Sequence, residues 1–120
     1  MASEKTISIS IAVRKNGLVA ADACTLVEDL TGTDYIAMPL TVATSWTQIS
    51  TGALASFDYL FLKNTDATNY IDVGNDDTED GIFARLTPGR AMIIPAKSDK
   101  NYFARAHTAA CVVNVVGVEP

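Results

Sequence analysis

The sequence predicts an all-β protein, an antiparallel β-sandwich or barrel that forms a single domain over residues 1–120. Apolar side chains alternate with small or polar ones at a period of two along most of the chain. The alternating segments are short, follow one another at about 8–12 residues, and are separated by glycine, proline, asparagine and aspartate. No internal repeat, linker or low-complexity tract divides the chain. We therefore expect about nine or ten short strands in one compact domain.

The first expected strand covers residues 6–13, where Ile7, Ile9, Ile11 and Val13 point to one side. The residues between them are small and uncharged, which predicts a half-buried strand. A Lys-Asn-Gly turn at residues 15–17 ends it. Because no charged side chain protects the edge of this strand, it could pair with a neighbouring chain by strand addition.

Turn-forming residues set the bounds of the other strands. The expected strands cover residues 24–30, 35–38, 46–49, 57–63, 70–73, 81–86, 90–94, 102–107 and 111–118. The segments that follow the first eight of these strands, in chain order, are Thr-Gly-Thr-Asp, Pro39, Ser-Thr-Gly, a polar turn at 64–69, an acidic loop, a Pro-Gly turn, a polar loop after Pro95 and Thr-Ala-Ala. The segment at 57–63 is the most hydrophobic, so we expect it to form a core strand.

Two sets of side chains alternate in that core strand. Phe57, Tyr59 and Phe61 share one face, and Leu60 and Leu62 share the other. We expect the aromatic face to lie in the core, because a sandwich needs large apolar residues there.

The composition bears on the class of partner. The net charge is −5, and the isoelectric point near 4.6 agrees with it, so the chain would repel a phosphate backbone and we expect no nucleic-acid partner. No run approaches the ~18 apolar residues of a membrane helix, and the first residues lack the pattern of a signal peptide. We therefore expect a soluble protein made in a reducing cytoplasm. Cys24 and Cys111 are expected to be buried thiols, with a disulfide as the open alternative.

The residues that catalysis would need are scarce. His107 is the only histidine, no Gly-x-Ser-x-Gly motif occurs, and neither cysteine has a basic neighbour in sequence. We therefore expect no enzyme, no small-molecule substrate and no cofactor. A hydrolase using His107 is the weakest alternative.

An acidic loop, Asn-Asp-Asp-Thr-Glu-Asp-Gly at residues 75–81, contains four carboxylates within five residues. Asp76 and Asp80 match the first half of a calcium-loop pattern, but the twelfth position is Thr87 instead of glutamate. We expect a solvated turn without metal. The alternative is a carbohydrate-binding module, in which this loop holds Ca²⁺ and exposed aromatic rings stack on sugars; the rings concerned would be Trp46, Tyr70 and Tyr102.

From about residue 45 onward the chain resembles small virion proteins of tailed bacteriophages. Four stretches carry the resemblance: WTQI at 46–49, LKNTDATNYIDVG at 62–74, FARLTPGRA at 83–91 and YFARA at 102–106. The resemblance implies a jelly-roll β-sandwich that serves as a capsid decoration (cement) protein, which binds the outside of the head and stabilises it. A neck or tail component is the alternative.

The same resemblance implies the partners and the location. The partners would be the major capsid protein and copies of the chain itself, as a homo-oligomer that could be a trimer. The protein would be assembled in the host cytoplasm and lie on the capsid surface of the virion, where a negative charge suits the outside of the shell. The candidate partner contacts are Ile7, Ile9, Ile11, Asn64, Asp66 and Asn69.

Overall fold

The computed structural model describes residues 5–28, 35–49, 59–95 and 102–118. Contacts divide the chain into two compact units, Met1–Thr31 and Gly32–Pro120. The first unit contains a two-stranded hairpin, and the second contains two four-stranded antiparallel sheets. The all-β fold predicted from the sequence is confirmed. A single domain over residues 1–120 stays a prediction, and the sandwich strands all belong to the second unit.

The hairpin pairs β1 (Lys5–Lys15) with β2 (Leu18–Glu28) along their whole length. Its two-residue turn has positive φ at Asn16 (49°) and Gly17 (86°), the pattern of a type I′ turn, for which Asn-Gly is favoured. The second strand begins at Leu18, well before residue 24, where the sequence placed its start. Pairing with β1 extends it through a stretch rich in alanine, which has little strand preference of its own.

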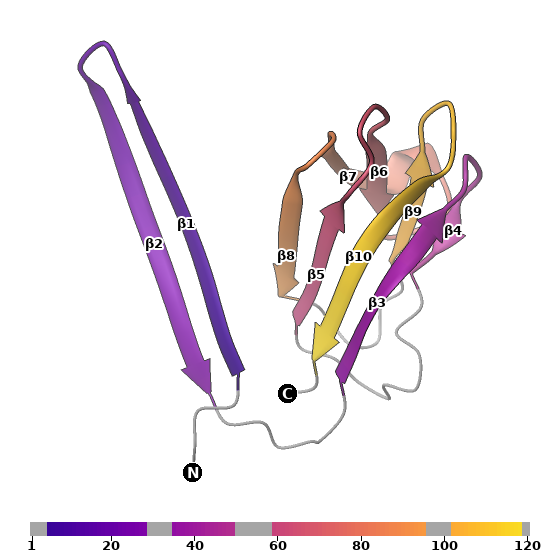
Figure 1. Cartoon of the computed structure of the whole chain (residues 1–120), viewed down its shortest axis with the longest axis horizontal. Helices are drawn as coiled ribbons and strands as arrows, with labels where there is room; N and C mark the ends of the chain where they lie inside the picture. The colour runs from indigo at the N-terminus through magenta and orange to yellow at the C-terminus, as the bar shows by residue number, and fades with distance from the viewer. Residues whose placement is uncertain (1–4, 29–34, 50–58, 96–101, 119–120) are drawn as a thin grey trace. The chain divides into compact units, whose positions relative to one another are not determined.

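The sandwich has the strand order of a jelly roll (Figure 1). Its first sheet has the order β3 (Tyr35–Val42), β10 (Cys111–Val118), β5 (Tyr59–Asn64), β8 (Ala91–Pro95). The second has the order β4 (Thr47–Gln48), β9 (Phe103–Ala106), β6 (Ile71–Gly74), β7 (Ile82–Leu86), and a short 3₁₀ turn, η1 (Glu79–Gly81), precedes β7. The first and last strands of the sandwich are neighbours, as are the second and the last but one, which is the jelly-roll arrangement of two Greek keys.

The core lies between the two sheets. Its buried apolar residues alternate along the strands: Val42, Ile49, Leu60, Leu62, Ile71, Val73, Leu86, Tyr102, Ala104, Ala106, Cys111, Val113 and Val115. In β5 the inward face is therefore the leucine face, and Tyr59 and Phe61 are half-buried on the other side. The expectation of an aromatic core face is wrong for these two residues, and Phe57 lies outside the described residues.

Pro39 does not end the third strand. β3 continues to Val42, with Pro39 opposite Asn114 of β10. Because β3 is an edge strand of its sheet, one side of it forms no ladder, and a residue without a backbone N–H is tolerated there.

The two cysteines differ in environment. Cys111 is buried in the core as expected, whereas Cys24 is exposed on β2, and both thiols are free. The prediction of two buried thiols is therefore wrong for Cys24. Burial raises the pKa of the Cys111 thiol, and the nearby negative charge of Asp66 raises it further, so this thiol is a poor nucleophile.

Candidate functional site

The hairpin presents one apolar face, because paired residues of an antiparallel ladder point to the same side. We call it the apolar hairpin face; its members are Ile7, Ile9, Ile11, Val13, Ala20, Cys24 and Leu26. Ile9, Ile11 and Val13 are 49%, 66% and 48% exposed, and Ile7 is half-buried. The structure thus places three candidate contact residues, Ile7, Ile9 and Ile11, on one apolar surface. The expected half-burial of this strand holds for Ile7 but not for Ile9 or Ile11.

The opposite face of the hairpin consists mainly of small residues. It carries Ser8 and Ser10 beside alanines, and its two larger apolar residues, Val19 and Val27, are 69% and 50% exposed. The two faces differ in kind, since only the first forms a continuous row of large apolar side chains.

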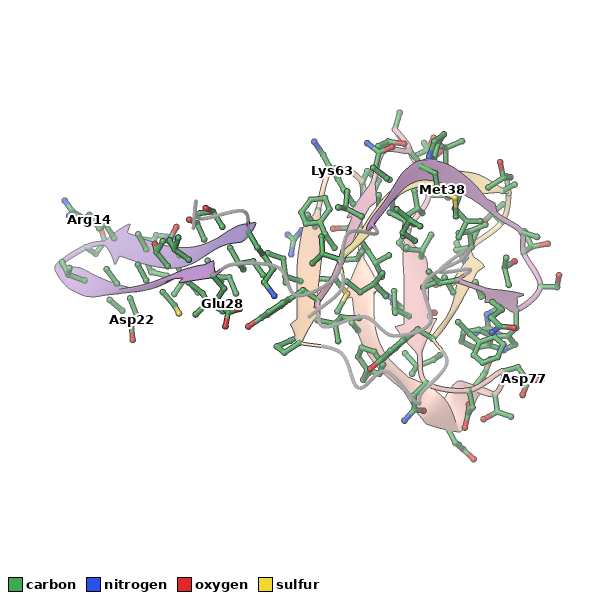
Figure 2. The ribbon with its side chains drawn as sticks, turned by 90° about the horizontal axis from the view of Figure 1, so that it is seen from below. Arg14, Asp22, Glu28, Met38, Lys63 and Asp77 are labelled. Atoms are coloured by element: carbon green, nitrogen blue, oxygen red, sulfur yellow. The ribbon has the colours of Figure 1, made fainter. Side chains whose placement is uncertain are left out.

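Charges on the apolar hairpin face are few and have defined places. At its base Lys5 is buried and its ammonium lies 3.2 Å from the Glu28 carboxylate, and Lys15 lies beside the turn. Asp22 lies between these ends, opposite Ile11, and its carboxylate accepts a hydrogen bond of 2.8 Å from the backbone N–H of Ala23. Figure 2 shows Asp22 and Glu28 extending to the same side of the ribbon.

The sandwich has a second apolar surface, on the side of its first sheet that faces away from the core. We call it the outer sheet face; its described members are Ala37, Pro39, Thr41, Tyr59, Phe61, Lys63, Ala91, Ile93, Pro95, Val112, Asn114, Val116 and Val118. Val112 and Val116 are 44% and 37% exposed. Among these residues Lys63 is the one charged side chain, and Figure 2 shows it extending from the sheet.

The polar turn after β5 is built around Asn64. The side chain of Asn64 is fully buried; its amide nitrogen donates to the carbonyls of Asn69 (3.0 Å) and Leu86 (2.9 Å), and its oxygen accepts from the N–H of Asp66 (2.9 Å). Asn64 therefore organises the turn through its buried side chain, and its contact with a partner stays a prediction.

The other two candidates of this turn are half-buried and also bond internally. The carboxylate of Asp66 accepts from the N–H groups of Thr68 (3.0 Å) and Asn69 (2.6 Å). The hydrogen bonds from Asn69 and then Thr68 hold the pKa of Asp66 below its usual value. Both residues hold the shape of the turn, and whether they also contact a partner stays a prediction.

The sequence reading missed a charged cluster on the outer side of the second sheet. Asp72 is 4% exposed and lies opposite both Arg85 and Arg105 in the ladders. Arg85 donates to it at 2.8 Å, and Arg105 lies 4.0 Å from it and 3.1 Å from Glu79. The hydrogen bond to Asp72 raises the pKa of Arg85. The sequence signal was the tripeptide Phe-Ala-Arg, which occurs at 83–85 and again at 103–105 and places an arginine on each side of the aspartate.

Tyr70 lies at one end of this cluster with both ring faces covered. The guanidinium carbon of Arg85 is 3.9 Å from its ring centroid, and the His107 ring stacks on it at 4.5 Å and 11°. These two residues come from opposite neighbours of β6, so they cover opposite faces. Tyr102 is buried, and Arg105 lies 4.8 Å over the Trp46 ring. Of the three rings considered for sugar stacking, only Trp46 has a ring face that these contacts leave open.

A polar hollow of about 340 Å³ lies beside this cluster, lined by residues that include Asp72, Glu79, Arg105 and His107. Its charged groups pair with one another, so it offers no single unpaired charge to a ligand. No described contact joins the His107 ring to a serine or cysteine side chain.

The acidic loop uses its carboxylates locally. Asp76 accepts hydrogen bonds from the backbone N–H (2.9 Å) and hydroxyl (2.7 Å) of Thr78. Among the described residues, no group of three or more histidine, cysteine, aspartate or glutamate side chains is placed to hold a metal ion. Asp76 and Asp80 thus lie in one loop without forming a described cation site.

Comparison with known proteins adds no relative. No protein-family model matches the chain, and neither a curated protein nor a solved structure matches it significantly. Within the described part of the chain, no helix has the length and apolarity that crossing a membrane would require.

Proposed function

We propose that the protein is a structural assembly protein, which associates with copies of itself through the apolar hairpin face. The observation that carries this proposal is a two-stranded sheet with three large apolar side chains about half exposed or more. An isolated hairpin is marginally stable in water, and an exposed apolar row of this kind is a typical protein–protein contact. The hairpin gains stability if copies of the chain cover this face.

The specific role that we propose is decoration of the outside of a tailed-phage head, with the major capsid protein as second partner. The resemblance of residues 45–120 to small virion proteins supports this role. So does the net charge of −5, which suits the outer surface of a shell better than its DNA-lined interior. A neck or tail component would use the same self-association.

Carbohydrate binding has less support. The ring of Tyr70 is covered on both faces and Tyr102 is buried, so neither offers a stacking platform. An exposed ring face is what binding a sugar by stacking requires.

The test is the mass of the full chain in solution, measured by sedimentation equilibrium for the wild type and two double variants. Ile9→Ser with Ile11→Ser makes the apolar hairpin face resemble the opposite one, which already carries serines in the same strand. The matched control, Val19→Ser with Val27→Ser, removes exposed valines from the opposite face. We expect the first pair to dissociate the oligomer and the control to leave it intact. Equal masses for all three proteins would refute this role of the hairpin.

Decoration of a head also requires that the protein bind the assembled shell. The wild-type protein should cosediment with empty heads assembled from the major capsid protein of the same genome. If the protein self-associates but does not cosediment with the heads, the decoration role fails, and an assembly role in another part of the particle remains.

A further inference from the structure

The outer sheet face is apolar across all four strands of its sheet. Ala37, Val116, Phe61 and Ile93 are direct neighbours in the ladders and form one continuous row from edge to edge. The adjacent row contains Pro39, Asn114, Lys63 and Ala91 in the same order of strands. A surface of this composition on a chain with a net charge of −5 is what a partner with an apolar face would cover.

The same chain carries a surface complementary to it. The apolar hairpin face is also a row of large aliphatic side chains, and its charge away from the ends is the carboxylate of Asp22. The outer sheet face has a single described charge, the ammonium of Lys63. Neither of these two charges forms an ion pair with another described residue. Both faces are apolar, and away from the two ends of the hairpin each carries one charge, of opposite sign, so the two faces match in both respects.

We infer that the apolar hairpin face of one copy packs on the outer sheet face of a second copy, with Asp22 beside Lys63. This inference rests on the proposed self-association and names the surface that receives the hairpin. Each copy gives one hairpin and receives one, so a closed oligomer covers every such face.

The dimensions allow a specific contact in a dimer. The longest strands of the receiving sheet have eight residues and extend about 27 Å, so a strip of two strands about 10 Å wide lying along them covers roughly 270 Å². Counting both surfaces, one docked hairpin buries on the order of 500 Å², and a dimer in which the two copies exchange hairpins buries on the order of 1,000 Å² in its one interface, the lower end of the range for specific interfaces.

A charge exchange in the full chain tests the pairing. We expect Asp22→Lys and Lys63→Glu each to raise the dissociation constant of the oligomer about tenfold, because each places two like charges together. The double variant restores the opposite charges and should return the constant to within about threefold of the wild type. Asp77→Lys and Arg90→Glu are the matched controls, since they change the net charge equally at exposed positions outside both faces. The controls should leave the constant within about threefold of the wild-type value.

The outcomes separate the inference from the proposed function. If both single variants weaken association and the double variant is weaker still, the two charges are not neighbours and the inference fails. If the serine variants of Ile9 and Ile11 dissociate the oligomer in the same experiments, the proposed function stands. If those variants leave the mass unchanged, the proposed function fails as well. A 12.8 kDa monomer in which the two charges couple in stability would place the hairpin on its own sheet and overturn the choice of a second copy.

Discussion

Asn64→Ala should destabilise the sandwich by about 3 kcal/mol, although the residue lies in a polar turn. The substitution removes three hydrogen bonds, to Asn69, Leu86 and Asp66, at 3.0, 2.9 and 2.9 Å. A hydrogen bond contributes about 1 kcal/mol net to stability, and the side chain is fully buried, so water does not replace the lost partners without rearrangement. Asn64→Asp should cost at least as much, because it turns a carboxylate oxygen toward two carbonyl oxygens.

The assay is urea unfolding followed by tryptophan fluorescence. Trp46 is the only tryptophan of the chain and belongs to the sandwich unit, so its emission reports the unfolding of that unit. The matched control is Asn114→Ala, an exposed asparagine on the outer side of the same sheet. We expect the control to change the free energy of unfolding by less than about 0.5 kcal/mol.

A loss below about 1 kcal/mol for Asn64→Ala, or one equal to that of Asn114→Ala, would refute the reasoning. It would mean that the buried amide does not hold the turn in the folded protein.

Three further predictions concern the sandwich. Leu62→Ala should lower the free energy of unfolding by about 2–5 kcal/mol, and Phe61→Ala should lower it clearly less, because β5 turns its leucines inward. Urea unfolding measures both values, and equal losses of stability would contradict the assignment of faces. Asp72→Asn should cost about 1–3 kcal/mol by the same assay, since it leaves the arginines beside a buried amide; a change no larger than that of the exposed Glu79→Gln would contradict this. Asp66 has a lowered pKa in the folded state, so its contribution is present above the unfolded pKa and is lost as the pH falls below about 4. Unfolding curves of the wild type and Asp66→Asn between pH 6 and 2 should therefore converge at low pH, and parallel curves would refute the linkage.

The sequence allowed the strands to be located because their apolar residues alternate and their turns are marked. The strand at residues 111–118 has the bounds that the alternation gave it, and the Asn-Gly turn of the hairpin lies where it was expected. Strand ends were less certain where pairing overrides local preference. β2 extends through alanines because β1 pairs with them, and β3 passes Pro39 because an edge strand tolerates it.

The inward face of a strand could not be predicted where both faces are apolar. In β5 the aromatic and the leucine faces are both hydrophobic, so the period of two gives the pairing of side chains but not their direction. The direction in which each face points is set by the packing of the two sheets, and this packing depends on strands that are distant in the sequence.

The candidate site was predicted in part. Alternation placed Ile7, Ile9 and Ile11 on one face, because that property is local to a strand. The burial of Asn64 and the exposure of the outer sheet face were not predictable, since both depend on strands distant in sequence. The same holds for Asp72, whose two arginines are brought together only by the order of the strands.

The most direct test of self-association is the mass of the wild-type chain in solution, measured by light scattering over a range of concentrations. It should be done with and without EDTA. We predict a stable multiple of the 12.8 kDa chain mass that EDTA does not change. A monomer at every concentration would contradict the account. A mass that changes when EDTA is added would indicate that the acidic loop binds a cation, although the described residues form no group of metal ligands there.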